Sequence, residues 1–351
     1  MAVHTQIDEP SCGQRGGRKR VHIISIRVVL CELLVQAVTL GTFFSGMETP
    51  FWALRQLNVK IDHVFACEKD KSCKRFIEAN CTSLRTLHTD VTVLKMSSLE
   101  TVDLFVAGFP CQPFSPAGRQ GGADDEQGRG QMFVPCVRYV KENSPKTFLF
   151  ENVAALRKHK KFKAVYDDMM SQIKHLPYVL FETIINTLDH GVPHCRSRFY
   201  LVGIRRDVYV GKFEFPTAVE PLPISAFLDR KCGKTEDIPT SKTHKNNLSR
   251  TIEKIMFDDN LDLRKQVLIV DVNVGLSRRP VFALDKMPCI TRSRGSASGF
   301  FIVNKSRMTT ARELLRFQGF TEDFVTDCVS DRQIGAMVVS HGFKLRRSGW
   351  G

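Results

Sequence analysis

The sequence predicts an α/β fold in which a mostly parallel sheet carries helices on both faces. Between residues 35 and 205, short apolar runs alternate with amphipathic segments. This alternation is typical of parallel strands joined by helical crossovers. Polar or glycine-containing segments follow several of the runs, and in open α/β folds such segments bind ligands at the carboxyl edge of the sheet.

Five apolar runs are predicted to form strands of this sheet. They span residues 38–44, 64–67, 102–107, 147–150 and 199–204. Each is short and rich in bulky apolar residues, as expected for a strand that is buried between two layers of helices.

Helix-start signals follow two of these strands and recur near the C-terminus. Thr49 is a predicted N-cap ahead of Pro50, Asp70 is a second predicted cap, and Thr310 has capping-box spacing to Glu313. Apolar residues then follow at helical spacing: Phe51, Leu54 and Leu57 in the first helix, Cys73, Phe76 and Ile77 in the second, and Leu314, Leu315 and Phe317 in the third.

Composition indicates a basic globular protein in a reducing compartment. Of the 351 residues, 42% are hydrophobic, which suits one large core or a large and a small domain. Lys and Arg outnumber Asp and Glu by 51 to 37. This excess favours a polyanionic partner, but a merely soluble basic protein explains it equally well. The eleven cysteines include no CxxC pair and no zinc spacing, so we expect free thiols and no metal site.

Residues 1–34 are predicted to be a basic tail and lead-in. Arg27 and Glu32 interrupt the apolar stretch at 21–40, so it lacks the span that a membrane helix needs. No small-residue cleavage site follows it, which argues against a signal peptide. The expected location is the nucleus in a eukaryote, otherwise the cytoplasm or nucleoid. The tail either touches nucleic acid, serves as a nuclear address or has no role.

Three strand-associated segments carry reactive side chains. In Gly-Phe-Pro-Cys-Gln-Pro-Phe-Ser, residues 108–115, Cys111 lies between two prolines directly after a strand. It is a candidate nucleophile, although a lone cysteine is more often structural. Glu151 ends the next strand as a general acid or a helix cap. Arg196 and Arg198 share one face before strand 199–204 and suit an anionic group, or form a solvated basic pair.

Together these segments resemble the cytosine-C5 DNA methyltransferase family. The Phe-Ser-Gly element at 44–46, the cysteine loop, Phe-Leu-Phe-Glu-Asn-Val, the Arg-x-Arg element and Ala-Arg-Glu-Leu-Leu-Arg-Phe-Gln-Gly-Phe occur in the family's order. The resemblance covers roughly residues 38–205 and 288–340. It implies the Rossmann-like sheet of S-adenosylmethionine-dependent methyltransferases with a small target-recognition domain. It also implies methyl transfer from S-adenosylmethionine to carbon 5 of a cytosine in duplex DNA.

The resemblance implies a role for each reactive residue. Cys111 would add to carbon 6 of a flipped-out cytosine, and Glu151 would donate a proton at N3. Arg196 and Arg198 would lie near the base and its covalent adduct. The implied cofactor-binding residues are Phe44, Ser45, Gly46, Glu68, Asp90, Val91 and Pro110. The implied substrate-binding residues are Gln112, Ser115, Arg292 and Arg294.

Five positions depart from the family pattern. Thr42 stands where Asp is usual, Glu48 and Thr49 replace glycines, His194 replaces Gln, and Ala336 replaces Asn. Four of the five lie at elements that the resemblance assigns to the cofactor, whereas the nucleophile, the acid and both arginines are retained.

The resemblance also predicts the domain organisation. Residues 35–205 form a catalytic cofactor-binding domain, 206–327 a target-recognition domain with a hinge, and 328–351 a segment that returns to the catalytic domain. Candidate DNA contacts are Arg278, Arg279, Arg292 and Arg294, which would meet phosphates or guanine edges. A solvated basic loop is an equally good explanation of them.

Three hypotheses therefore follow. The first is a monomeric DNA cytosine-C5 methyltransferase, and the second is a tRNA-modifying relative that shares the Pro-Cys-Gln and Glu-Asn-Val elements. The third is a basic DNA-binding protein that has lost turnover, which the altered cofactor loop motivates. Cofactor binding separates the third from the others, and matched DNA and RNA substrates separate the first two.

Overall fold

The computed structural model describes residues 36–114, 121–122, 125–126, 128–230, 241–255, 262–296 and 299–338. The predicted basic tail at 1–34 and Ser115 lie outside the described residues. Within the described ranges, none of the helices is long and apolar enough to span a membrane.

A seven-stranded sheet forms the larger part of the molecule, in the order β3-β2-β1-β4-β5-β7-β6. Its strands are β1 (Val38–Phe43), β2 (Ile61–Cys67), β3 (Thr86–His88), β4 (Leu104–Ala107), β5 (Thr147–Val153), β6 (Tyr178–Asn186) and β7 (Ser197–Arg205). The first five strands in this order, β3, β2, β1, β4 and β5, are parallel, and β7 runs antiparallel to both β5 and β6. The predicted α/β fold and all five predicted strands are confirmed; β3 and β6 were not predicted.

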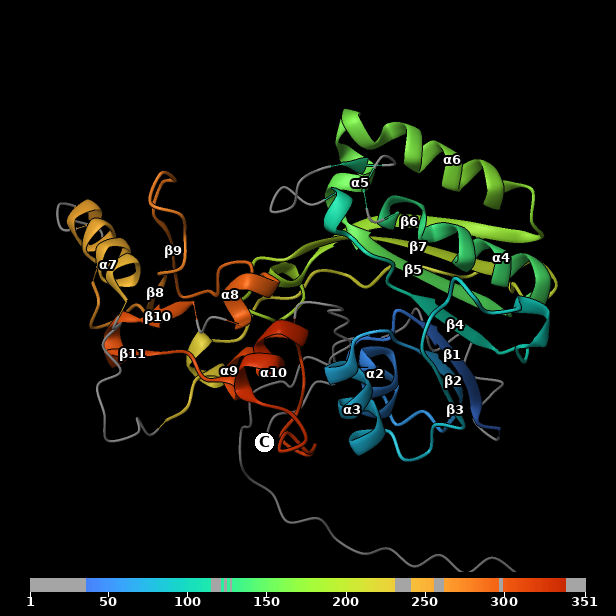
Figure 1. Cartoon of the computed structure of the whole chain (residues 1–351), viewed down its shortest axis with the longest axis horizontal. Coiled ribbons are helices and arrows are strands. Elements are labelled where there is room, and N and C mark those ends of the chain that lie inside the picture. The colour runs from blue at the N-terminus through green and yellow to red at the C-terminus, as the bar shows by residue number, and fades with distance from the viewer. Residues whose placement is uncertain are drawn as a thin grey trace, which may run out of the picture.

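Helices cover both faces of this sheet (Figure 1). On one face, α4 (Phe133–Asn143) and α6 (Lys163–Lys174) bury aromatic and aliphatic side chains against β4 and β5. The short α5 (Ala154–Lys158) follows β5 directly. On the other face, α2 (Thr49–Gln56) and α3 (Lys71–Asn80) share a core with the C-terminal helices α9 (Ala311–Arg316) and α10 (Asp331–Met337).

Two helix starts agree with the sequence and one does not. Asp70 accepts hydrogen bonds from the backbone N–H groups of Ser72 and Cys73, and Thr310 forms a complete capping box with Glu313. The predicted cap at Thr49 is wrong, because α2 already includes Thr49 and Glu48 takes the cap position. Glu48 has a φ of 54° and makes no side-chain cap, since its carboxyl group points into the protein instead.

A second sheet lies beyond β7 in the chain, in the order β11-β10-β8-β9. It contains β8 (Leu268–Asp271), β9 (Val281–Leu284), β10 (Phe300–Ile302) and β11 (Arg307–Met308), all antiparallel. Helix α7 (Lys242–Ile255) packs against it through Ile255, Leu268 and Val270. This sheet lies within residues 206–327, the range predicted to be the target-recognition domain.

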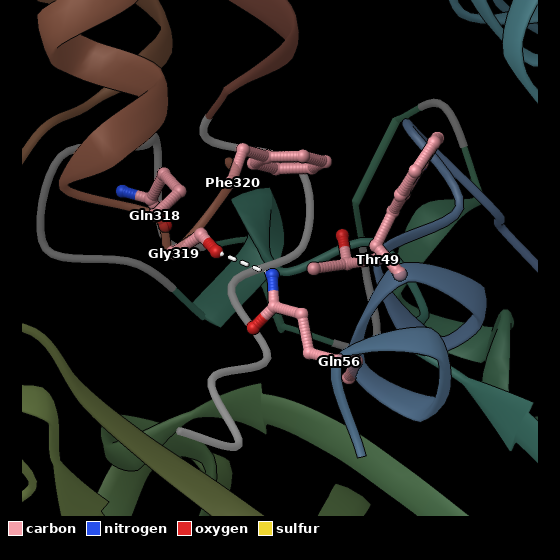
Figure 2. A pocket seen from close by; sticks show the side chains of 7 residues that line it. Thr49, Gln56, Gln318, Gly319 and Phe320 are labelled. Carbon is pink, nitrogen blue, oxygen red and sulfur yellow. Dashed lines mark hydrogen bonds between the residues drawn. The ribbon is translucent and has the colours of Figure 1, made fainter. Parts of the chain in front are cut away.

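Two close contacts join residues 311–338 to neighbouring elements. Helix α10 crosses α8 (Arg292–Ser296) so closely that a Cβ atom on Gly335 would lie 2.1 Å from the carbonyl oxygen of Gly295. Figure 2 shows a second junction, in which the Gln56 side chain of α2 donates a 2.8 Å hydrogen bond to the Gly319 carbonyl. The cavity there measures about 10 Å³, which is room for at most one water. The junction is therefore tightly packed.

Candidate active site

The loop after β4 presents the Cys111 thiol. Phe109 and Phe114 are buried on either side of it, and the Asn152 side chain donates a 3.0 Å hydrogen bond to the Phe109 carbonyl. These contacts hold the loop while the cysteine itself stays partly exposed. Burial raises the pKa of the Cys111 thiol, and the positive charge of Arg198 offsets part of that effect.

Glu151 and Arg198 form a buried ion pair across β5 and β7. Their strands are neighbours, with Glu151 opposite Tyr200, and Arg198 Nε lies 2.9 Å from Glu151 Oε1. The side chains are 5% and 10% exposed. Because Glu151 lies within β5 and Val153 is the residue that precedes α5, the helix-cap explanation for Glu151 is wrong.

Arg196 adds a second, fully buried guanidinium. Burial and the like charge of Arg198 lower the pKa of Arg196, and Glu151 acts in the opposite sense. Burial acts to lower the pKa of Arg198, but the negative charges of Glu151 and its neighbours, among them Cys111, together raise it. The site therefore holds two guanidinium groups against one carboxylate. Such a site favours a ligand that develops negative charge.

The first three parallel strands end at the predicted cofactor residues. Gly46 N donates a 2.7 Å hydrogen bond to Glu68 Oε2, and Asp70 N donates one of equal length to Oε1. These bonds set the orientation of the Glu68 carboxylate. Phe44 and Gly46 both have positive φ values, 54° and 57°, so the backbone turns sharply where the loop leaves β1.

The remaining predicted cofactor residues differ in their surroundings. Asp90 accepts hydrogen bonds from Lys69 Nζ, at 2.8 Å, and from Thr92; these contacts lower the pKa of Asp90 to about 2. Val91 is buried in the core, and Pro110 is partly exposed next to Cys111. The Ser45 hydroxyl is buried and accepts from Cys67 N at 3.1 Å, so it binds strand β2.

The predicted DNA contacts are held more firmly than the sequence indicates. Arg294 Nε donates a 2.9 Å hydrogen bond to the buried Asp271, and Arg292 Nη2 lies 3.0 Å from Asp70. Gln112 is exposed in the cysteine loop. Arg292 also lines a polar cavity of about 230 Å³ between α3, α8 and α10, which Ala336 borders as well.

Two contributors to the site were not assigned from the sequence. Asn152 anchors the cysteine loop; its place directly after Glu151 at the strand end was the available signal. His194 Nε2 accepts a hydrogen bond from Ile290 N at 3.3 Å and so ties the Arg-x-Arg element to the segment before α8. Its partner is 96 residues away, a distance that local sequence patterns do not reveal.

Comparison with known proteins assigns the family. Residues 38–341 match the model for C-5 cytosine-specific DNA methylase. The chain belongs to this family. Type II methyltransferase M.NgoBI of Neisseria gonorrhoeae is 32% identical over 263 residues, which are 75% of this chain and 76% of that protein. M.HpaII of Haemophilus parainfluenzae is 29% identical over 327 residues, 87% of each chain.

Solved structures agree with this C-5 cytosine methylase in fold. The methyltransferase EhMeth of Entamoeba histolytica superposes with a TM-score of 0.58 at 19% identity, covering 87% of this chain and 93% of that one. The predicted family and the predicted methyltransferase fold are thus confirmed. In this chain Thr42 and Glu48, which depart from the family pattern, are both buried, and Thr42 Oγ1 lies 2.7 Å from the Ser45 hydroxyl in the loop at 44–46.

Proposed function

We propose that this protein transfers a methyl group from S-adenosylmethionine to carbon 5 of a cytosine in duplex DNA. The observation that carries the proposal is the meeting of three chemical groups at one sheet edge. The partly exposed Cys111 thiol, the Glu151 carboxyl and the guanidinium groups of Arg196 and Arg198 influence one another electrostatically there.

These groups suit the chemistry that cytosine requires. The Cys111 sulfur adds to carbon 6 and forms a covalent bond, while Glu151 supplies a proton at N3. Carbon 5 becomes nucleophilic and takes the methyl group. Loss of the carbon 5 proton to a base such as water then returns the electron pair that expels Cys111 as a thiolate, and N3 gives its proton back to Glu151. Arg196 and Arg198 stabilise the negative charge that the addition pushes onto the ring.

The loops at the ends of β1 to β3 have the donor set for the cofactor. Glu68 suits the two ribose hydroxyls, Asp90 suits the adenine amino group, and Phe44 offers a ring for the purine face. S-adenosylmethionine supplies an electrophilic methyl group when bound. Gly46 leaves room beside Glu68, since it has no side chain.

Duplex DNA is favoured over RNA as the substrate. The matching family model describes a DNA methylase, and the relatives are Type II methyltransferases. The target base must leave the helical stack to reach Cys111. We propose that methyl transfer takes place in a catalytic domain at 35–205 and that residues 206–327 form a target-recognition domain with a hinge. Residues 328–351, which include α10, would return to the catalytic domain.

Covalent trapping tests the proposal. The protein is mixed with S-adenosylmethionine and duplex DNA carrying 5-fluorocytosine in varied contexts, with matching RNA in parallel. Fluorine replaces the carbon 5 hydrogen, so the final elimination stalls. We expect a denaturation-resistant adduct on DNA that Cys111→Ser abolishes while cofactor binding persists. An adduct on RNA alone would move the assignment to RNA, and none on either would contradict the mechanism.

A further inference from the structure

A buried acid lies beneath the loop that leaves β1. Glu48 follows Gly46 by two residues, is fully buried and has a φ of 54°. Side chains rarely adopt this left-handed conformation, which explains why glycine is usual at the position. Its carboxyl group turns inward and accepts a hydrogen bond from the Thr42 hydroxyl, the residue that replaces the usual Asp.

The acid is linked to both sides of the loop. Thr42 Oγ1 lies 2.7 Å from the Ser45 hydroxyl, which accepts from Cys67 N at the end of β2. Glu68 follows Cys67 directly and holds Gly46 N at 2.7 Å. The Glu48 carboxyl therefore supports a continuous set of contacts from β1 through the loop to the carboxylate that we assign to the ribose.

A histidine completes the cluster from β2. His63 is fully buried, its Nε2 lies 3.5 Å from Glu48 Oε2, and its ring stacks on Phe51 of α2 with centroids 5.2 Å apart. Within the described residues, neither Glu48 Oε2 nor either ring nitrogen of His63 has a hydrogen-bond partner. A charge on either residue would be poorly solvated here.

Burial shifts both residues toward their neutral forms. It raises the pKa of Glu48 to about 8 and lowers the pKa of His63 to about 4. The other ionisable groups that influence the pair are Glu68, Asp62 and Cys81. Burial also raises the pKa of the Cys81 thiol, so that thiol does not titrate near neutral pH.

We propose that Glu48 is a positioning residue for the cofactor loop, which it holds through Thr42 and Ser45 with His63 behind it. The acid that the family usually places at position 42 has in this chain moved to position 48. Ionisation of Glu48 would place a second negative charge near Glu68 without solvent, and the loop would open. The inference rests on the proposed function only in taking residues 44–46 as the cofactor loop.

The pH dependence of stability tests the buried acid without any cofactor. The pKa of Glu48 is higher in the folded than in the unfolded chain. Its contribution to the free energy of unfolding is therefore present at low pH and is lost as pH rises toward 8. The pKa of His63 is lower when folded, so its contribution is lost as pH falls from 6.5 to 4. Between pH 4.5 and pH 6.5 the two contributions to stability change with pH in opposite directions and cancel. Above pH 6.5 only the contribution of Glu48 still changes with pH.

The first experiment compares wild type with Glu48→Gln, which keeps the shape and cannot ionise. Between pH 6.5 and 8.5, we expect the folding equilibrium constant of wild type to fall up to about tenfold per pH unit relative to the variant. Calorimetry with S-adenosylhomocysteine, whose sulfur is uncharged, should show affinity falling over the same range in wild type and much less in Glu48→Gln. Parallel pH profiles of stability and affinity in both proteins would overturn the proposal.

A swap of residues provides the second experiment. Thr42→Asp alone places two carboxyl groups in one buried site, and Glu48→Gly alone removes the acid. Each should weaken S-adenosylhomocysteine binding about tenfold or more, whereas Thr42→Asp/Glu48→Gly restores the usual family residues at these two positions and should bind within about threefold of wild type. A double variant no better than the weaker single variant would refute the relocation. Failure of wild type to bind at pH 6.5 would instead count against the proposed function, since the stability profiles do not depend on the ligand.

Discussion

The proposed base side and the proposed cofactor side of the site lie at the same edge of the sheet but depart from the family to different degrees. Cys111, Glu151, Arg196 and Arg198 are retained, and the partly exposed cysteine interacts electrostatically with the buried, charged side chains of the other three. On the cofactor side, Thr42 and Glu48 replace the usual residues, and a different polar network holds the loop. Reacting atoms require particular side chains, whereas a loop requires only that its backbone be held in place.

Replacing Glu151 by Gln should have the largest effect of the substitutions that probe this contrast. The carboxamide keeps the shape and can still accept from Arg198, but it cannot deliver a proton. We expect kcat to fall by about 10²–10⁴-fold with DNA affinity little changed, measured by single-turnover methylation and by titration of duplex.

Glu182→Gln is the matched control. Glu182 also pairs with an arginine, Arg157 at 2.9 Å, but both side chains are about a third exposed or more. Exposed pairs contribute little, so this variant should methylate like wild type. If Glu151→Gln lost affinity and rate equally, Glu151 would be structural, and the base side would resemble the cofactor side.

The sequence predicted the strands better than the contacts between them. Buried runs such as 102–107 are visible because parallel strands are apolar throughout, whereas the three-residue β3 has no such run. The cap at Thr49 was wrong by one residue because a buried contact with Thr42, six residues away, decides the conformation of Glu48. The ion pair of Arg294 with Asp271 could not be predicted, because the two residues are 23 positions apart.

Helix α10 carries Ala336, one of the departures from the family pattern, and crosses α8 closely; Gly335→Ala should disturb this crossing. The new Cβ would lie 2.1 Å from the backbone of Gly295, so the two helices must separate. Overpacking of this kind costs about 1–3 kcal/mol, which urea unfolding would measure. Gly275→Ala is the control, since a Cβ there meets nothing within 4 Å. Equal stability of the two variants would show that the crossing is not tightly packed.

The loop between β8 and β9 belongs to neither side, and its arginines are exposed. It projects from the smaller sheet (Figure 1) and carries Arg278 and Arg279. Helix α7 orders it: Arg250 donates to the carbonyls of Leu276 and Arg278 at 3.0 Å, and Asn247 to those of Val272 and Val274. A loop held in this way loses little conformational freedom on binding.

Arg278→Ala should therefore weaken DNA binding without loss of stability, the smallest effect of the three. One lost phosphate contact costs roughly 1 kcal/mol and lowers the slope of log K against log salt by about 1 for any duplex. Arg264→Ala serves as the control, because Arg264 is equally basic and exposed but is bound to Asp262. A change in preferred sequence with an unchanged salt slope would instead show that Arg278 reads bases. The identity of its side chain would then matter for function, as we propose for the side chains on the base side.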